Sequence, residues 1–343
     1  MRDLLPCGRP ALVLVPMQDV TDLAFMRVIA RRGAPDWFVT EYFRVHPDFS
    51  LRSYILRSIK ENVTGRPVFA QVIGSDVPSL VRAARLLAEL PVAGIDLNLG
   101  CPAPIVCRKH AGGAWLKDPA GVGRLLGMMR AVISGRFTVK TRVGYADAGE
   151  FAQLLEIFRA CGLDGLTVHA RTVGERYQTP VHPECVRMAV AAMPCPVIAN
   201  GNVVDTATGL ALLEQSQAAG LMIGRGAIRN PWLFRQIREH QRGEPIFIPR
   251  GTEVLAYVRA LYEAVCLPAA RESEQVQRMK KYMNYLGVGV EPTGQFLHQI
   301  RRVKTTADLF RVCAESLDHD QPMPLEPFLL ALKEGDLMAG EQR

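Results

Sequence analysis

Short apolar runs recur through the first two-thirds of the chain, and each is rich in β-branched or other apolar residues. Runs of this length are typical of strands that are buried on both faces of a parallel sheet. We predict eight strands from them: Ala11–Met17, Trp37–Glu41, Pro67–Ile73, Gly94–Asn98, Phe137–Arg142, Leu166–His169, Val197–Asn200 and Leu221–Ile223.

Helical patterns lie between most of these runs. Asp76–Leu90 has apolar residues at helical spacing and begins with a suitable N-cap, and Phe151–Ala160 and Thr206–Gln215 follow the same pattern. Strand and helix alternate eight times, which predicts an α/β protein with a TIM (β/α)8 barrel. A doubly wound sheet is the alternative. It would have fewer strands, and no G-x-G-x-x-G turn follows Met17.

The pattern changes at Gly243–Gly251, where Gly and Pro stand at both ends of a predicted linker. Beyond it the strand signal disappears, and three segments show helical spacing: Thr252–Leu267, Glu272–Leu286 and Thr293–Ala314. We therefore expect a barrel domain over residues 1–243, a small C-terminal helical bundle domain over 250–330 and a tail over 331–343.

Composition agrees with a globular protein that has a large core, since 48% of the 343 residues are hydrophobic. No apolar stretch reaches the roughly 20 residues of a membrane span, and the first residues do not read as a secretory signal, so we expect a cytoplasmic protein. The eight cysteines show no zinc-binding spacing, and no metal site is predicted. The net charge of +7 suits a polyanionic partner but equally an ordinary basic protein.

Catalytic groups in such barrels lie where the strands end, and the end of the fourth predicted strand is the most informative. There Asn98 is followed by a Gly-Cys-Pro turn centred on Cys101. A cysteine on a constrained turn suits an acid or a nucleophile better than a packing role. Cys107 is the competing candidate, because the cations that follow it can lower the pKa of a thiol.

Cations also follow the fifth and sixth predicted strands. Lys140 and Arg142 are expected on one side of the fifth strand, because side chains alternate along a strand. Unpaired charge inside a barrel is costly, so the two indicate an anionic or electron-rich ligand. His169 ends the sixth strand, where a structural role and a catalytic role are equally open.

The last two strands end in the glycine-containing loops Asn200–Asn202 and Gly224–Gly226. Loops at these positions commonly bind phosphate in TIM barrels, and Arg225 provides a charge-assisted partner. The amide of Gln71, at the third strand, suits a ring carbonyl or N–H, although a solvated glutamine is equally open. These features indicate flavin mononucleotide (FMN), with another phosphorylated ligand as the alternative.

The chain resembles the tRNA-dihydrouridine synthase family in segments that cover the whole predicted barrel in the family's order. The segment around the Gly-Cys-Pro turn is the most specific. The matching segments are VPMQDVTDLAF near the start, TEY at Thr40–Tyr42, FAQVIG at Phe69–Gly74, GIDLNLGCPAPIVCRKHAGGAWLKDP at Gly94–Pro119, VKTRVGY at Val139–Tyr145, TVHART at Thr167–Thr172, PVIANGNV at Pro196–Val203 and MIGRGAIRNPWLF at Met222–Phe234. Gln18 and Asp19 depart from a frequent Glu and Gly.

The resemblance implies a flavin-dependent oxidoreductase that uses FMN and NADPH to reduce the C5–C6 double bond of a uridine in tRNA to 5,6-dihydrouridine. Hydride would pass from flavin N5 to C6 and a proton from Cys101 to C5. The implied catalytic residues are Cys101, Asn98, Lys140 and His169. The implied cofactor-binding residues are Pro16, Met17, Gln18, Gln71, Lys140, His169, Asn200, Gly201, Asn202, Gly224 and Arg225.

The uridine has to be flipped out of the folded RNA to reach a barrel mouth. We expect the RNA to be held by the cations Arg142, Arg171, Arg278, Lys280, Lys281, Arg301 and Arg302, with a solvated helix face as the alternative for the last five. Tyr282 and Tyr285 are candidates to stack on a base. The resemblance also implies a monomer. Two rival functions stay open: an FMN reductase of a small free pyrimidine or enone, and an RNA-binding module whose barrel has lost its chemistry.

Overall fold

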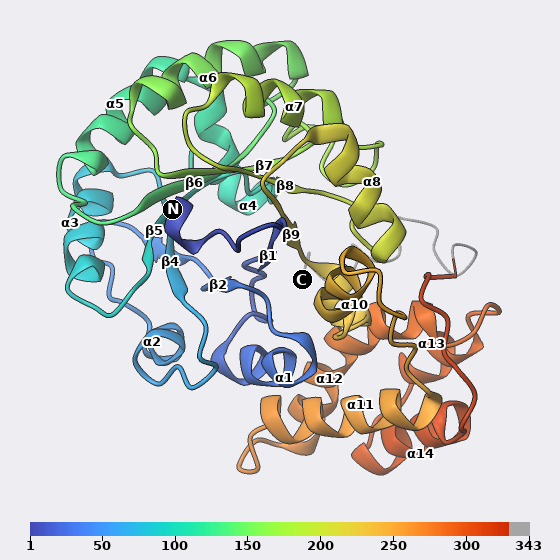
Figure 1. The fold of residues 1–343 in the computed structure, drawn as a ribbon. Coiled ribbons are helices and arrows are strands. Elements are labelled where there is room, and N and C mark those ends of the chain that lie inside the picture. The colour runs from blue at the N-terminus through green and yellow to red at the C-terminus, as the bar shows by residue number, and fades with distance from the viewer. Residues whose placement is uncertain (329–343) are drawn as a thin grey trace. The chain divides into compact units, whose positions relative to one another are not determined.

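The computed structural model describes residues 1–328, and a closed barrel of parallel strands is its main feature (Figure 1). The ring runs in the order β1, β2, β4, β5, β6, β7, β8 and β9, and β9 pairs with β1 to close it. The strands are β1 (Ala11–Leu14), β2 (Trp37–Val39), β4 (Val68–Gly74), β5 (Gly94–Leu99), β6 (Phe137–Arg142), β7 (Gly165–His169), β8 (Val197–Asn200) and β9 (Gly220–Ile223). All eight predicted strands form, and the predicted TIM barrel is confirmed.

One strand escaped the sequence analysis. β3 (Phe43–Val45) pairs with the end of β4 outside the ring, with Phe43 beside Val72. It has three residues and a polar arginine in the middle, so it offers no apolar run of strand length. The predicted tail at 331–343 lies outside the described residues, as do residues 329 and 330 of the predicted bundle.

Helices connect the barrel strands and lie on the outside of the ring (Figure 1). The capping predicted for the helix after β4 is present, since the side chain of Asp76 accepts the backbone N–H of Ser79 at 3.0 Å. These helices are α2 (Ser53–Lys60), α3 (Val77–Ala88), α5 (Pro119–Arg130), α6 (Phe151–Ala160), α7 (Pro183–Ala192) and α8 (Thr206–Ser216).

Apolar side chains close the amino-terminal end of the barrel. Met1, Leu4 and Leu5 pack against a buried cluster that includes Ala11 and Trp37. The 3₁₀ helix η1 (Arg2–Leu4) carries this segment. Because that end is filled, the polar groups of the barrel gather at the carboxyl ends of the strands, as is usual for this fold.

The chain divides into two compact units, and the second comprises residues 24–34, 204–208 and the chain from Gly224 onward. The predicted limits at 243 and 250 remain predictions. Helices of the second unit are α1 (Leu23–Gly33, apart from its first residue), α9 (Arg225–Arg229), α10 (Leu233–Gln241), α11 (Gly251–Val265), α12 (Glu272–Leu286), α13 (Gln295–Ile300) and α14 (Thr306–Leu317).

The predicted helix Thr293–Ala314 is wrong, because the structure divides it into α13 and α14. A second N-cap causes the division. The side-chain oxygen of Thr305 accepts the backbone N–H of Asp308 at 3.1 Å, and its hydroxyl also contacts the Asp308 carboxylate at 2.9 Å. The apolar spacing continues through this break, which explains why the pattern alone reads as one helix.

Within residues 1–328, no helix combines the length and the apolar character needed to cross a membrane. The same residues contain no group of His, Cys, Asp or Glu side chains arranged to hold a metal ion. The eight cysteines, all within the described part of the chain, are free thiols.

Candidate active site

Asn98, at the end of β5, builds the turn that carries Cys101. Its side-chain oxygen accepts the backbone N–H of Gly100 at 3.0 Å and that of Cys101 at 2.9 Å. Its amide nitrogen donates to Gln71 on the neighbouring strand β4 at 2.9 Å. Asn98 is buried and Cys101 is partly exposed, so the asparagine positions the thiol from within the barrel wall.

A buried carboxyl group extends this network into the barrel. Asp96 accepts Gln71 Nε2 at 2.7 Å and the hydroxyl of Thr138 at 2.6 Å. Burial raises the pKa of Asp96, against these two hydrogen bonds. Both Gln71 and Asn98 therefore have fixed amide orientations. Gln71 has two amide hydrogens, and one of them binds Asp96. The other is left for the predicted contact with a flavin.

The thiol of Cys101 is held in its protonated form. Burial raises its pKa, and the nearby Arg142 and Lys140 offset only part of that effect. A protonated thiol suits an acid and not a thiolate nucleophile. Burial raises the pKa of Cys107 as well, and it outweighs the cations Lys117 and Arg142, which lower that pKa. Cys107 instead donates its S–H to the carbonyl of Cys101 at 3.5 Å and braces the same turn.

Lys140, on β6, provides a cation whose pKa is lowered. It is in register with Asn98 on β5 and Thr167 on β7. Burial lowers its pKa to about 8, with Arg142 adding to the effect and Asp96 and Cys101 opposing it. Among the described residues, its ammonium has no hydrogen-bond or ion-pair partner. A partly buried cation of this kind is arranged to meet an electron-rich ligand.

His169, at the end of β7, has one nitrogen engaged and one unpaired. Asn200 donates from Nδ2 to the Met222 carbonyl at 2.7 Å, which turns its oxygen toward His169 Nδ1 at 2.9 Å. Nδ1 therefore carries the proton, and burial lowers the pKa of His169 well below 6.5. The buried Nε2 has no partner among the described residues. A neutral acceptor of this kind calls for a ligand N–H or O–H.

The loop after β8 leaves room beside this ring. Gly201 has φ of 136°, and a Cβ there would lie 2.8 Å from Val181 and 3.9 Å from His169 Nε2. Asn202 also has a positive φ, of 50°. The side chain of Asn200 is occupied by His169 and Met222, so it orients the histidine and is not turned toward a phosphate.

Two of the predicted RNA-contacting cations are buried instead. Arg142 is 1% exposed and donates to the carbonyls of Gly100, Thr172 and Arg176 at 2.9, 2.7 and 2.7 Å. Arg171 is also 1% exposed, and its Nε donates to the Thr179 carbonyl at 2.5 Å. Because both side chains are buried, the structure gives no support to direct RNA contact by these two residues, and that contact stays a prediction. The backbone carbonyls of folded loops bind them.

The loop after β1 is tied to the segment after β2. Gln18 Oε1 accepts the hydroxyl of Tyr42 at 2.5 Å and Arg44 at 3.0 Å. Tyr42 in turn belongs to an apolar cluster with Ile73, against which Cys101 packs. The departure from Glu at position 18 thus keeps an acceptor for Arg44, since an amide oxygen replaces a carboxylate. Pro16 and Met17 lie in the same loop, where Thr21 Oγ1 accepts the Met17 N–H at 3.0 Å.

The predicted phosphate-binding residues lie in both compact units. Gly201 and Asn202 belong to the first, whereas Gly224 and Arg225 belong to the second. Gly224 precedes α9, and Arg225 is the first residue of that short helix. A phosphate site formed by all four stays a prediction.

The helical region carries its cations on exposed or half-buried side chains. Arg301 and Arg302 line a cavity of about 550 Å³ together with Gly294, Leu297 and His298. Lys280 donates to the Arg301 carbonyl at 3.0 Å, and Lys281 is exposed. Arg278 is half-buried. Tyr282 is fully buried with its ring 5.6 Å from that of Phe25, so the expectation that it stacks on a base is wrong.

Three residues near the site were missed by the sequence analysis: Asp96, Tyr42 and Tyr177. Asp96 had a signal, because it shares a strand face with Asn98 at the two-residue repeat. Tyr42 belongs to the TEY segment of the family resemblance, whereas Tyr177 had no signal in the sequence. The ring of Tyr177 lies edge-on to that of His169 at 5.7 Å, and the Arg142 guanidinium lies 5.1 Å from its centre. Only the folded chain brings these groups together.

Comparison with known proteins agrees with this geometry. The family model described as dihydrouridine synthase matches residues 13–320. The tRNA-dihydrouridine(16) synthase of Neisseria meningitidis serogroup B (strain ATCC BAA-335 / MC58) is 30% identical, over 90% of this chain and 96% of its own length. That of Cupriavidus necator is 30% identical over 88% and 95%. The tRNA-dihydrouridine synthase B of Pseudomonas putida is 35% identical over 72% and 73%.

The chain belongs to the dihydrouridine synthase family. It is accordingly a flavin-using oxidoreductase that acts on tRNA.

Proposed function

We propose that this protein reduces the uridine at position 16 of tRNA to 5,6-dihydrouridine, with FMN as its bound flavin and NADPH as the reductant. The position is supported by how much of each relative is matched. The chain covers 95% and 96% of two relatives named as position-16 synthases, but 73% of the synthase B relative, although the latter is more identical. The resemblance to the position-16 enzymes thus extends over more of the molecule.

The residues present fit a flavin. The unpaired Nε2 of His169 offers an acceptor, Lys140 offers a cation, and Gln71 has one amide hydrogen left. These three would hold the ring. The first loop, at Pro16–Gln18, would line it. On the loop after β8, Gly201 and Asn202 would hold the ribityl phosphate, with a backbone N–H group approaching through the glycine.

The protein itself would contribute a proton and a stabilising positive charge to the reaction. When bound and reduced, the flavin supplies the hydride that reaches C6 of the uracil. Negative charge then develops on C5 and on the C4 carbonyl. Cys101, kept protonated by burial, donates its proton to C5, and Asn98 keeps that thiol in place. Lys140 offsets the charge on the ring oxygens.

The RNA would be held through its phosphates by the helical region. Arg301 and Arg302 line a cavity of about 550 Å³, and Lys281 and Arg278 lie on α12. Recognition of this kind depends on RNA shape and charge, with the target base turned out of the stack. We infer that the protein acts as a monomer in the cytoplasm, where its eight free thiols stay reduced.

The placement of Cys101 on the turn that Asn98 holds is the observation that carries the proposal, and Cys101→Ala tests it. The variant should retain its flavin and its reduction by NADPH, while uridine reduction falls by at least about 100-fold, because general acid catalysis typically contributes that much. Anaerobic stopped-flow absorbance measures the two half-reactions separately. Cys161→Ala, a half-buried cysteine at the end of α6, is the matched control.

The rival assignments give different results. If Cys107 were the acid, tRNA would no longer oxidise the reduced flavin in Cys107→Ala, whereas it would still do so in Cys101→Ala. Equal turnover on free uridine and on unmodified tRNA would indicate a small-molecule reductase. A purified protein that cannot be loaded with FMN would contradict the cofactor. Mass spectrometry of tRNA from cells without the protein should show the two-hydrogen increment missing at position 16, and an intact increment there rejects the position.

A further inference from the structure

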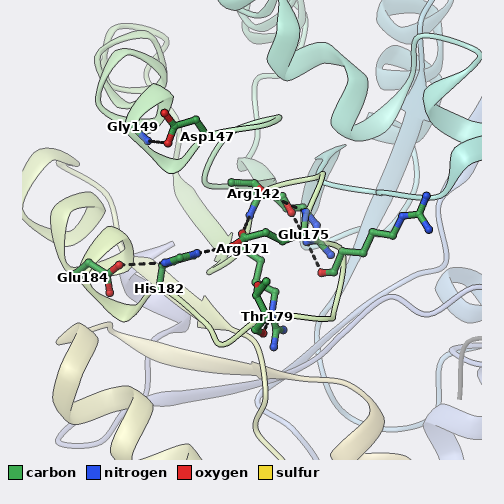
Figure 2. A network of polar contacts seen from close by, with 10 residues as sticks. Arg142, Asp147, Gly149, Arg171, Glu175, Thr179, His182 and Glu184 are labelled. Carbon is green, nitrogen blue, oxygen red and sulfur yellow. Dashed lines mark hydrogen bonds and ion pairs between the residues drawn. The ribbon is translucent and has the colours of Figure 1, made fainter. Parts of the chain in front are cut away.

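The loop that follows β7, residues 170–182, is closed by a set of charged side chains (Figure 2). Glu175 accepts the backbone N–H of Thr172 at 2.6 Å through Oε2. Its other oxygen lies 2.8 Å from Nε2 of His182, at the far end of the loop. Nδ1 of His182 lies 3.2 Å from the carboxylate of Glu184, on α7. We call Glu175, His182 and Glu184 the latch.

The latch is complete only when His182 is protonated. Both ring nitrogens face a carboxylate oxygen, and only the imidazolium carries a proton on each. The hydrogen bond to Glu175 raises the pKa of His182, with Glu184 adding to it. Burial raises the pKa of Glu175, but its hydrogen bonds to His182 and Thr172 outweigh burial and bring it to about 2. Glu175 is therefore an anion throughout the physiological range.

The segment between the latch residues carries an aromatic side chain to the candidate active site. Tyr177 lies two residues after Glu175, with its ring edge-on to that of His169. Arg142 lies over the same ring and donates to the carbonyls of Thr172 and Arg176. Because Arg142 also donates to the Gly100 carbonyl, the loop and the turn that carries Cys101 share one guanidinium.

We propose that Glu175 and His182 are positioning residues for tRNA reduction: the latch closes the loop that Arg142 binds and so sets Tyr177 beside the base that reacts. Closure strengthens as His182 takes up a proton. This inference rests on the proposed function, because the loop is proposed to help hold the uridine that is reduced. Neither residue touches the reacting atoms, and their effect passes through Tyr177.

The holoenzyme variants Glu175→Gln and His182→Gln test the inference. Glutamine at 175 keeps the shape but has one acceptor oxygen, so with Thr172 bound to that oxygen it cannot accept the Nε2 proton of the His182 imidazolium. We expect KM for tRNA to rise roughly tenfold, as for loss of one charge-assisted hydrogen bond, while kcat and the reduction of bound flavin by NADPH stay within about twofold. Glu156→Gln, which breaks an exposed ion pair with Arg159 on α6, is the matched control.

The pH profile separates positioning from plain stability. In the parent, KM should rise as the pH increases through the raised pKa of His182 and the imidazolium loses its proton, whereas His182→Gln should have a raised KM with no such dependence. Hydrogen exchange of residues 171–179 should be faster in both variants than in the parent and in Glu156→Gln.

Parental KM and exchange in Glu175→Gln would overturn the inference, as would equal losses in kcat, flavin reduction and melting temperature. If the parent protein makes no dihydrouridine, the proposed function is refuted. The hydrogen-exchange measurements would then still show whether the latch closes the loop.

Discussion

Glu41, next to the first loop, allows a stability prediction with a definite sign. It follows β2, is 3% exposed, and contacts the hydroxyl of Tyr54 at 3.3 Å. Burial raises its pKa from 4.5 to about 7, and the carboxylates of Asp19 and Asp22 raise it further, while hydrogen bonds from the Asp19 backbone and from Tyr54 oppose the shift. Nothing in the proposed mechanism uses this carboxyl group.

The pKa difference converts into a loss of stability at high pH. A carboxyl group whose pKa is raised by folding contributes fully below its unfolded value of 4.5, and that contribution is lost as pH rises through the folded value of about 7. The separation is about 2.5, at 1.36 kcal/mol for each tenfold change, which is about 3 kcal/mol. Glu41→Gln removes the ionisation, and its amide N–H groups can face the two aspartates.

The expected result is a pH-dependent gain in stability. Relative to the parent, the free energy of unfolding of Glu41→Gln should increase by about 2 kcal/mol more at pH 8 than at pH 5. Urea unfolding of the flavin-free proteins at four pH values measures this difference. Glu61→Gln, which removes an exposed carboxylate paired with Arg57 on α2, should show no such trend. A constant difference between Glu41→Gln and the parent from pH 5 to 8 would refute the reasoning.

Two further predictions follow from the same contacts. Asn98→Ala removes three hydrogen bonds and should lower the free energy of unfolding, measured with urea, by about 3 kcal/mol. It should also lower kcat by at least about tenfold, because the Cys101 turn loses the side chain that positions it. An unchanged kcat would show that the turn keeps its shape without Asn98. Arg301→Glu with Arg302→Glu should weaken tRNA binding and flatten its dependence on salt, measured by filter binding; an unchanged salt slope would remove this cavity from the RNA interface.

Local patterns were enough for the architecture. The ends of β6 and β8 and of α6 and α12 agree with the predicted ranges, because apolar spacing and capping residues act within a few positions of the chain. The same patterns misplaced the division between α13 and α14, where Thr305 caps a new helix without interrupting the apolar spacing. They also passed over β3, whose partner on β4 lies about 30 positions away.

The sequence by itself determined the barrel, the Gly-Cys-Pro turn and the polar residues at its strand ends, because strand alternation and turn chemistry are local properties. The tertiary structure alone decided which of those residues are partners. Arg142 meets carbonyls 42 and 30 positions away, and Asn200 turns to His169 across 31 positions. Contacts between such distant positions depend on strand register and on which nearby group is least costly to desolvate. The pattern of residues along the chain specifies neither the register nor the desolvation cost.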